Sequence, residues 1–208
     1  PSWLVFGSGF NQSFLRSFGK RTFDLLVSIA LFIVTLPIML LTSILIYLED
    51  RSPIFYRQER VGKDGQSFMV LKFRSMRNDA EKKSGPQWAS ANDPRTTRIG
   101  RVIRKLRVDE LPQIVNVIKG EMSFVGPRPE RPHFVEQLCE EVPYYNMRHS
   151  IKPGITGMAQ VRYQYGASVE DSIQKLQYDL YYVKNNSLFL DMLILIETLQ
   201  VVLLGKGQ

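Results

Sequence analysis

Residues Leu25–Leu48 read LLVSIALFIVTLPIMLLTSILIYL, and this stretch decides the class of fold because none of its 24 residues is charged. Sixteen of them are Leu, Ile, Val or Phe, which favour bilayer insertion by about 5–10 kcal/mol before polar and backbone costs. A straight helix of this length would measure about 36 Å, enough to span the hydrocarbon core. The stretch is too long for a signal peptide, and a buried core helix this long usually shows a polar stripe. The sequence therefore predicts a membrane segment.

Two features of this segment favour a hairpin over a straight span. Pro37 stands in its middle and lacks a backbone N–H, so the helix should kink or break there, with nearby hydroxyl groups binding the freed carbonyls. Cations flank both ends, at Arg16, Lys20 and Arg21 before it and at Arg51, Arg57, Arg60 and Lys63 after it. Because cations mark the cytoplasmic side, we expect both ends on that side and a re-entrant helix–break–helix hairpin over residues 19–50. These residues alone leave a second alternative, a helix that crosses the membrane once.

The composition narrows the class of partner. The chain has 208 residues and a formal net charge of +7, which points to phosphates, a membrane surface or nucleic acid. Nucleic acid is not expected, because the apolar stretch is unusual for such proteins and no recognition motif occurs. Cys139 is the single cysteine, so an intramolecular disulfide is impossible, and with only two histidines beside it we expect no structural zinc site.

The rest of the chain predicts an α+β architecture. We expect a lead-in segment over residues 1–18, the membrane hairpin over 19–50 and a cytoplasmic catalytic domain over 51–208. Runs of strand formers on both sides of Asp64-Gly65 predict a small β-hairpin ending near residue 73. Helices are expected over residues 97–107, 108–119, 133–141, 168–185 and 188–204. The last is apolar enough for an amphipathic helix at the membrane interface or for a packed bundle.

A cluster of six cations directly precedes an acidic pair. The cations are Arg95, Arg98, Arg101, Arg104, Lys105 and Arg107. A solvated helix face or contact with anionic lipid would explain them if they stood alone. Asp109 and Glu110 follow at once, and Asp109 suits the N-cap of a helix with Pro112 in its first turn. Beside a helix N-terminus and arginines, Asp109 should stay ionised. Such a group can hold phosphates while a carboxylate binds metal or attacks phosphorus.

Two further segments can add cations to the same pocket. Residues Ser123–Pro132 contain three prolines within six residues, so the backbone that carries Arg128 and Arg131 is rigid. The planar guanidinium of arginine suits phosphate oxygens. Lys72 stands at the end of a predicted strand and could reach this pocket or only the lipid surface. The glycines of Lys152–Gln160 permit a close backbone approach. For the proline-rich segment Ser123–Pro132, the alternative is a purely structural loop whose arginines face the solvent.

Taken together, these motifs make the chain similar to the bacterial sugar transferases, which are monotopic polyprenyl-phosphate phosphoglycosyl transferases. The matching motifs are Lys20–Asp24, Tyr56–Gly62, Lys72–Met76, Asp109–Gln113, Gly126–Pro129 and Lys152–Gly157, in the order of the family. Residues 165–171 and the first three residues resemble the exopolysaccharide-associated subgroup. Members of that subgroup usually carry a further N-terminal region, so we expect this chain to be the catalytic region of something longer. Met158 stands where many members have Trp.

The resemblance implies a reaction and the residues for it. A UDP-sugar donates sugar-1-phosphate to polyprenol phosphate (undecaprenyl phosphate), giving polyprenol diphosphate sugar and UMP in the first membrane step of exopolysaccharide assembly. Asp109 is implied as the nucleophile that forms a covalent aspartyl-phosphosugar, and Glu110 as the paired catalytic carboxylate. Both are candidate ligands of Mg²⁺. The implied phosphate ligands are Arg104, Arg128, Lys72 and Arg131. The implied location is the inner membrane, with the catalytic domain on its cytoplasmic face and anionic lipid as a partner.

Other functions stay open on the sequence. A monotopic scaffold that binds anionic lipid without catalysis would explain the apolar segment and the charge, but not the acidic pair among arginines. An ordinary glycosyl transferase would release UDP instead of UMP. The sequence leaves the sugar and the oligomeric state open, with a homodimer as one alternative.

Overall fold

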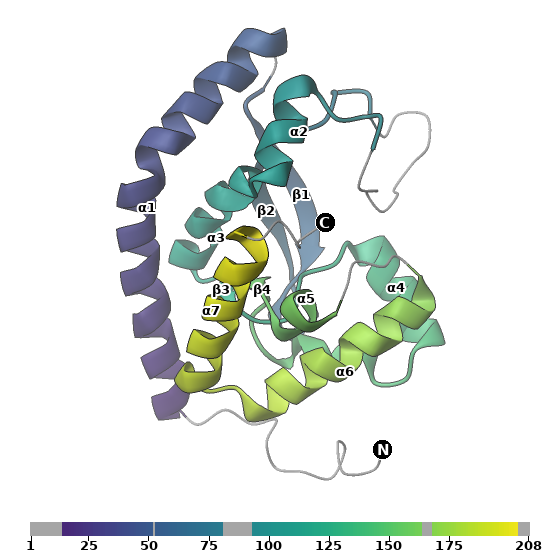
Figure 1. Ribbon diagram of the computed structural model, residues 1–208. Helices are drawn as coiled ribbons and strands as arrows, with labels where there is room; N and C mark the ends of the chain where they lie inside the picture. The colour runs from purple at the N-terminus through teal and green to yellow at the C-terminus, as the bar shows by residue number, and fades with distance from the viewer. Residues whose placement is uncertain (1–13, 52, 81–92, 164–167, 204–208) are drawn as a thin grey trace.

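A computed structural model describes residues 14–51, 53–80, 93–163 and 168–203 (Figure 1). The helices are α1 (Phe14–Asp50), α2 (Arg98–Lys105), α3 (Ile114–Lys119), α4 (Pro132–Glu141), α5 (Met158–Arg162), α6 (Val169–Asn185) and α7 (Leu188–Leu203). The strands are β1 (Phe55–Val61), β2 (Ser67–Phe73), β3 (Ser123–Val125) and β4 (Gly154–Thr156). Three short 3-10 turns complete the described elements: η3 (Lys63–Gly65), η4 (Val108–Gln113) and η5 (Tyr145–Ser150). The predicted mixture of helices with a small amount of sheet is confirmed.

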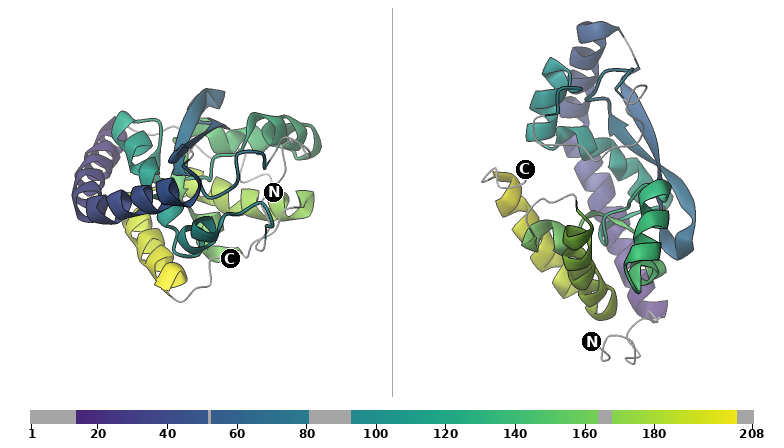
Figure 2. Two further views of the ribbon diagram at one scale, coloured as in Figure 1. Left: turned by 90° about the horizontal axis from the view of Figure 1, so that it is seen from above. Right: turned by 90° about the vertical axis from the view of Figure 1, so that its right-hand side faces the viewer.

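The membrane segment forms one helix, α1, which continues through Pro37. Of the two expected outcomes at this proline, a kink or a break, the structure shows the kink and no break, and the re-entrant course of the segment stays a prediction. Pro37 removes one backbone donor, but the helix bends instead of ending, and Figure 2 shows its two halves pointing in different directions from above. Thr35 and Ser43 donate to the carbonyls four residues earlier, at 2.7 and 2.8 Å. The side of a membrane on which each end lies stays a prediction.

The two faces of α1 differ in polarity, and the exposed face is the more apolar one, although Met39 and Ile46 are also buried on the inner face. Four polar side chains are buried on the face toward the domain: Asp24, Ser28, Thr35 and Thr42. The exposed side chains of α1 include Leu26, Ile29, Ile33, Val34, Leu40, Leu41, Ile44 and Leu48. A core helix has the opposite arrangement, because apolar side chains are normally the buried ones. The helix is long and apolar enough to cross a membrane, and an exposed apolar patch of this length indicates contact with lipid or protein.

The predicted β-hairpin is confirmed. β1 and β2 pair antiparallel from Phe55↔Phe73 to Val61↔Ser67. Asp64 and Gly65 both have positive φ at the turn, 54° and 77°, as the Asp-Gly pair predicts. Figure 1 shows this hairpin between α1 on one side of the domain and α4 with α6 on the other.

A second, parallel pairing of β3 with β4 lies in the core and fixes the loop that follows β3. Ser123 pairs with Gly154 and Val125 with Thr156. A Cβ added to Gly154 would lie 2.2 Å from the backbone nitrogen of Gly126, so only glycine fits at this contact. The expected close backbone approach at the glycines of this segment is therefore present.

Local contacts fix several helix ends. Ser168 and Asp171 form a reciprocal capping box at the start of α6. Thr97 caps α2 by accepting from the Gly100 N–H at 2.9 Å. Gly120 ends α3 with φ of 86°, in the left-handed region that favours glycine. α7 exposes Phe189, Met192, Ile196 and Leu199, and its place at a membrane interface stays a prediction.

Candidate active site

The acidic pair lies on the 3-10 turn η4, between α2 and α3, and not at the start of an α-helix. The N-cap of the turn is Arg107, which is in the left-handed conformation with φ of 57° and makes no side-chain capping hydrogen bond, and Asp109 lies inside the turn. The helix expected over residues 108–119 is therefore split, and its α-helical part begins only at Ile114. The N-cap prediction for Asp109 is wrong because the turn at Arg107 places the pair beside β2 instead of at a helix end.

Glu110 joins two of the predicted phosphate-binding cations. Its Oε1 accepts from Lys72 Nζ at 3.0 Å and from Arg128 Nη2 at 2.7 Å. Burial alone would raise the pKa of Glu110, but the charges of Arg128 and Lys72 outweigh it and hold that pKa well below its usual value. Burial lowers the pKa of Lys72, and the charge of Glu110 opposes that shift. The structure thus brings β2, η4 and the loop after β3 to one point, as the sequence predicted.

Asp109 has a different environment from its neighbour. Its side chain is 9% exposed, and its Oδ1 is buried with no hydrogen-bond partner among the described residues. Burial, and then the charge of Glu110, raise the pKa of Asp109 to about 6, although Lys72, Arg107 and Arg104 oppose the shift. A pKa of about 6 agrees with the ionised Asp109 that the sequence predicts at neutral pH, but burial and the charge of Glu110 outweigh the arginines. Two carboxylates whose pKa values are pushed apart suit two different roles.

Arg104 is the member of the cation cluster that turns inward. Its Nη1 is buried and has no hydrogen-bond partner among the described residues. Its charge contributes to lowering the pKa of Asp109. Arg98, Arg101 and Lys105 are exposed, while Arg95 forms an ion pair with Asp93 at 2.5 Å. Arg107 is half-exposed and its charge also lowers the pKa of Asp109. The six cations therefore do not act as one face, and Arg104 and Arg107 are the two whose charges act on Asp109.

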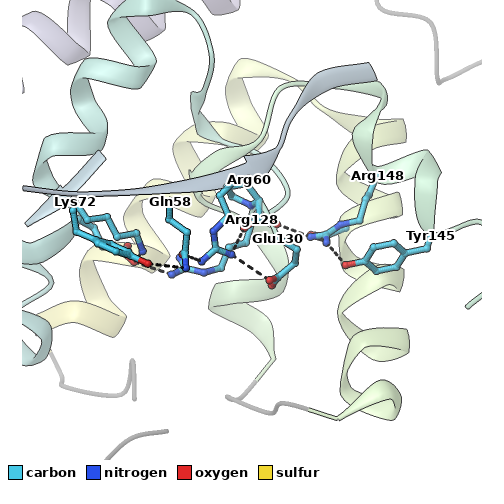
Figure 3. A network of polar contacts seen from close by, with 11 residues as sticks. Gln58, Arg60, Lys72, Arg128, Glu130, Tyr145 and Arg148 are labelled. Carbon is cyan, nitrogen blue, oxygen red and sulfur yellow. Dashed lines mark hydrogen bonds and ion pairs between the residues drawn. The ribbon is translucent and has the colours of Figure 1, made fainter. Parts of the chain in front are cut away.

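Arg60 lies close enough to Arg128 and Arg131 for both of their charges to lower its pKa, although burial is the larger cause. The guanidinium carbon of Arg131 lies 5.9 Å from the centre of the Phe134 ring, at the start of α4. Arg60 donates to the Pro129 carbonyl at 2.9 Å and to Glu130 Oε2 at 3.3 Å (Figure 3). Sequence reasoning gave Arg60 no role beyond a flanking charge. Two sequence features could have indicated a role for Arg60. It belongs to the Tyr56–Gly62 family motif, and on a strand it shares a face with Gln58.

Arg148 is a second residue that sequence reasoning missed. Its Nη2 donates to the main-chain carbonyl of Arg128 at 2.9 Å and pairs with Asp179 Oδ2 at 2.7 Å. Its Nη1 donates to the Tyr145 hydroxyl, and Figure 3 shows this contact beyond Glu130. Arg148 is buried, so it anchors the proline-rich loop from inside the domain. Nothing in the sequence pattern around Arg148 indicates this contact.

The pair of carboxylates Asp109 and Glu110, called the dyad below, also suits a divalent metal. Magnesium is usually held by one or two carboxylates together with phosphate oxygens of the substrate. Asp109 and Glu110 are consecutive and supply two carboxylates, and Oε1 of Glu110 already pairs with Lys72 and Arg128. Oxygens other than this one and Asp109 Oδ1 are the ones that would bind the metal. Within the described part of the chain, no cluster of three or more His, Cys, Asp or Glu side chains could form a metal cage without substrate.

Comparisons with known proteins identify the family of this chain. The model of the bacterial sugar transferase family matches residues 15–205. The chain is 47% identical over 193 residues to a UDP-N-acetylgalactosamine-undecaprenyl-phosphate N-acetylgalactosaminephosphotransferase of Aeromonas hydrophila, covering 93% of this chain and 45% of that protein. It is 41% identical over 186 residues to the undecaprenyl-phosphate glucose phosphotransferase of Komagataeibacter xylinus, covering 87% and 35%.

A shorter relative has nearly the same extent as this chain. The exopolysaccharide production protein PSS of Rhizobium leguminosarum bv. phaseoli is 42% identical over 197 residues, covering 90% of this chain and 97% of that protein. The chain spans less than half the length of the Aeromonas and Komagataeibacter relatives. The family match covers nearly the whole chain and includes the dyad and both of its cationic partners, so the chain belongs to the bacterial sugar transferase family.

Proposed function

We propose that this chain transfers sugar-1-phosphate from a UDP-sugar to polyprenol phosphate in two steps, with Asp109 as the covalent nucleophile. The observation that carries the proposal is the difference between the two dyad carboxylates. Glu110 is held by Lys72 and Arg128, whereas the buried Oδ1 of Asp109 has no hydrogen-bond partner among the described residues. The Aeromonas and Komagataeibacter relatives, both named undecaprenyl-phosphate sugar phosphotransferases, support the same substrate classes.

In the first step, the diphosphate of the donor lies against Arg128, Lys72 and Arg104. Asp109 Oδ1 attacks the β-phosphorus, the bond from that phosphorus to the bridging oxygen breaks, and the electron pair leaves with UMP. The pKa of about 6 makes the Asp109 carboxylate more basic than an ordinary aspartate while leaving it ionised at neutral pH. Glu110 keeps Lys72 and Arg128 in place during this step.

In the second step, an oxygen of the lipid phosphate attacks the phosphorus of the aspartyl-phosphosugar. The phosphorus–oxygen bond to Asp109 breaks, which restores the carboxylate and gives polyprenol diphosphate sugar. Asp109 and Glu110 are the residues that would hold Mg²⁺, which when bound neutralises charge on the diphosphate oxygens. The arginines and Lys72 supply positive charge from the protein itself.

The acceptor in this reaction is a membrane lipid, and the surface of α1 suits that. The apolar side chains of α1 face away from the domain, so the domain can rest against a bilayer. We place the catalytic domain on the cytoplasmic face of the inner membrane, because cations flank both ends of the apolar stretch. The first membrane step of exopolysaccharide assembly is the corresponding biological role.

A scaffold that binds anionic lipid without catalysis is the alternative, and the dyad argues against it. A buried acceptor without a partner costs about 1–3 kcal/mol, and the raised pKa of Asp109 shows that its charged form is disfavoured. A scaffold gains nothing from such a residue, whereas an enzyme uses it as a nucleophile.

The test is a single-turnover experiment without lipid acceptor. Enzyme mixed with Mg²⁺ and a UDP-sugar labelled at the β-phosphate should release UMP once per site. The label should stay on the protein as an acyl phosphate that hydroxylamine removes. Asp109→Asn should abolish both signals, whereas Asp79→Asn, at an exposed aspartate outside the site, should leave both unchanged.

Two outcomes would count against the covalent route. The first is label retained by the Asp109→Asn variant. The second is UMP that appears only after polyprenol phosphate is added, which would favour direct transfer in a ternary complex with Asp109 as base or metal ligand.

The Glu110→Gln variant should lose turnover, and high Mg²⁺ should restore part of it.

A further inference from the structure

A cavity of about 320 Å³ lies beside the N-terminal part of α1 and takes no part in the proposed reaction. Its lining residues include the cations Lys20, Arg21, Lys63 and Lys152, with Asp24 as the single acidic residue among them. The volume is at the lower end of the range for small-ligand pockets, about 300–1,000 Å³. The cavity is therefore large enough for a small anionic group and is lined mainly by positive charge.

Three of the five charged residues already have partners in the fold. Lys20 forms an ion pair with Asp191 at 2.6 Å, and Asp24 accepts from the Ser123 hydroxyl at 3.1 Å. Arg21 donates to the carbonyls of Val117 and Ile118, at 2.6 and 2.7 Å. Those carbonyls are neutral, so the charge of Arg21 has no carboxylate partner in these contacts.

The other two cations have little compensation. Lys63 lies 3.8 Å from Asp64, in a pair that is more than half exposed and therefore weak. Lys152 is partly buried and has no hydrogen-bond or ion-pair partner among the described residues. Burial and then the charge of Arg21 lower the pKa of Lys152, and Asp24 offsets only part of this. A partly buried ammonium group beside a guanidinium and without a counter-ion is a place where an anion would be stabilised.

The cavity is separate from the dyad. Lys63 lies in the turn of the β-hairpin, beyond the Val61↔Ser67 pair, whereas Lys72 pairs with Tyr56 five register steps away. At about 3.4 Å per step, this places the two cationic groups about 17 Å apart along the strands. An anion in the cavity therefore does not occupy the place of the donor diphosphate.

Aromatic side chains from the N-terminal end of α1 also line the cavity. Phe14 and Phe18 line the cavity, are mostly exposed, and stack with ring centres 6.5 Å apart. Leu15 and Leu26 are further exposed apolar side chains near this end of α1, so the helix presents apolar surface here. A ligand with a phosphate in the cavity could lay an acyl chain along this surface, which a free phosphate ion could not use.

We propose that this cavity binds the phosphate group of an anionic membrane phospholipid, with Lys152 and Arg21 as its main contacts. The site goes beyond the proposed transfer reaction and does not depend on it. A lipid bound there would hold the N-terminal end of α1 at the headgroup layer, next to the turn between β1 and β2 that carries Lys63.

The test measures lipid binding by the full chain in a neutral detergent. Calorimetric titration compares dihexanoyl phosphatidylglycerol, dihexanoyl phosphatidylcholine and inorganic phosphate. Phosphatidylglycerol should bind tightest, and Lys152→Met should weaken its binding by at least about tenfold. Lys152→Arg should retain binding, because it keeps the charge. Arg57→Met removes the same charge from an exposed position on β1 and should leave binding unchanged.

Several outcomes would overturn the proposal. Binding that is equal in the Lys152→Met variant and the unmodified chain would remove Lys152 from the site. An equal loss in Arg57→Met would mean attraction to overall charge. If inorganic phosphate binds as tightly as phosphatidylglycerol, the ligand is a soluble anion and not a lipid. Melting temperatures of all variants check folding, and unchanged UMP release in Lys152→Met separates this site from the dyad.

Discussion

Arg148 donates to the main-chain carbonyl of Arg128 at 2.9 Å, although 20 residues separate them in the chain. The same guanidinium is neutralised by Asp179 of α6 at 2.7 Å. Arg128 in turn lies 2.7 Å from the dyad carboxylate Glu110. A buried ion pair in the domain interior thus holds the loop from which the phosphate-binding side chain of Arg128 projects.

Arg148→Lys should lower the rate of UMP release by about tenfold, because an ammonium group cannot keep all three contacts in one plane. The same substitution in an Arg128→Ala background should have little further effect, since Arg148 acts through Arg128. Single-turnover kinetics of the two single variants and the double variant measure this coupling. Arg162→Lys, in an exposed pair with Glu197, is the control. Additive losses in the double variant would mean that Arg148 acts by another route.

Arg104→Ala and Arg128→Ala should each raise the barrier to transfer by about 1.5–3 kcal/mol, roughly ten- to a hundredfold in rate. Both side chains are placed to make charge-assisted contacts with the donor diphosphate. Arg101→Ala removes an exposed cation from the same helix as Arg104 and should keep the full rate. Turnover with UDP-sugar and polyprenol phosphate is the measurement, with membrane association checked in parallel. A wild-type rate in either variant would remove that arginine from the site.

The rate of covalent-intermediate formation should fall as the pH drops through about 6. The nucleophile must be ionised, and the pKa of Asp109 is raised to about 6 by burial and by Glu110. An aspartate with its ordinary pKa near 3.8 would keep its full rate down to about pH 5. Arg104→Ala should move the midpoint to higher pH, because the charge of Arg104 lowers the pKa of Asp109. Single-turnover UMP release between pH 5 and 8 gives both midpoints. A flat profile across this range would contradict the environment described for Asp109.

Cysteines placed at Gly19 and at Ser52, in a Cys139→Ser background, should react with an impermeant thiol reagent only after cells are opened. Cations flank both ends of the apolar stretch, so both positions should lie on the cytoplasmic side. Pro37→Ala restores a backbone donor in the middle of α1 and should favour a straight span. Labelling of either position from outside intact cells would show that α1 crosses the membrane.

The features that the sequence determined by itself are those set by neighbours along the chain. The charge-free stretch, the Asp-Gly turn, the capping box at Ser168 and the left-handed Gly120 each depend on a few consecutive residues, and the structure shows all four. Family motifs also selected Asp109, Glu110, Lys72 and Arg128 as one site.

The features that only the tertiary structure decided depend on groups brought together from distant segments. Burial and the charge of Glu110 raise the pKa of Asp109, which a count of neighbouring arginines could not predict. The roles of Arg60 and Arg148 come from contacts with a loop 69 and 20 residues away. Pro37 weakens α1 locally, but the helix continues because its polar face is packed against the domain along its length. Desolvation, charge and packing act through space, so they are fixed only when the chain has folded.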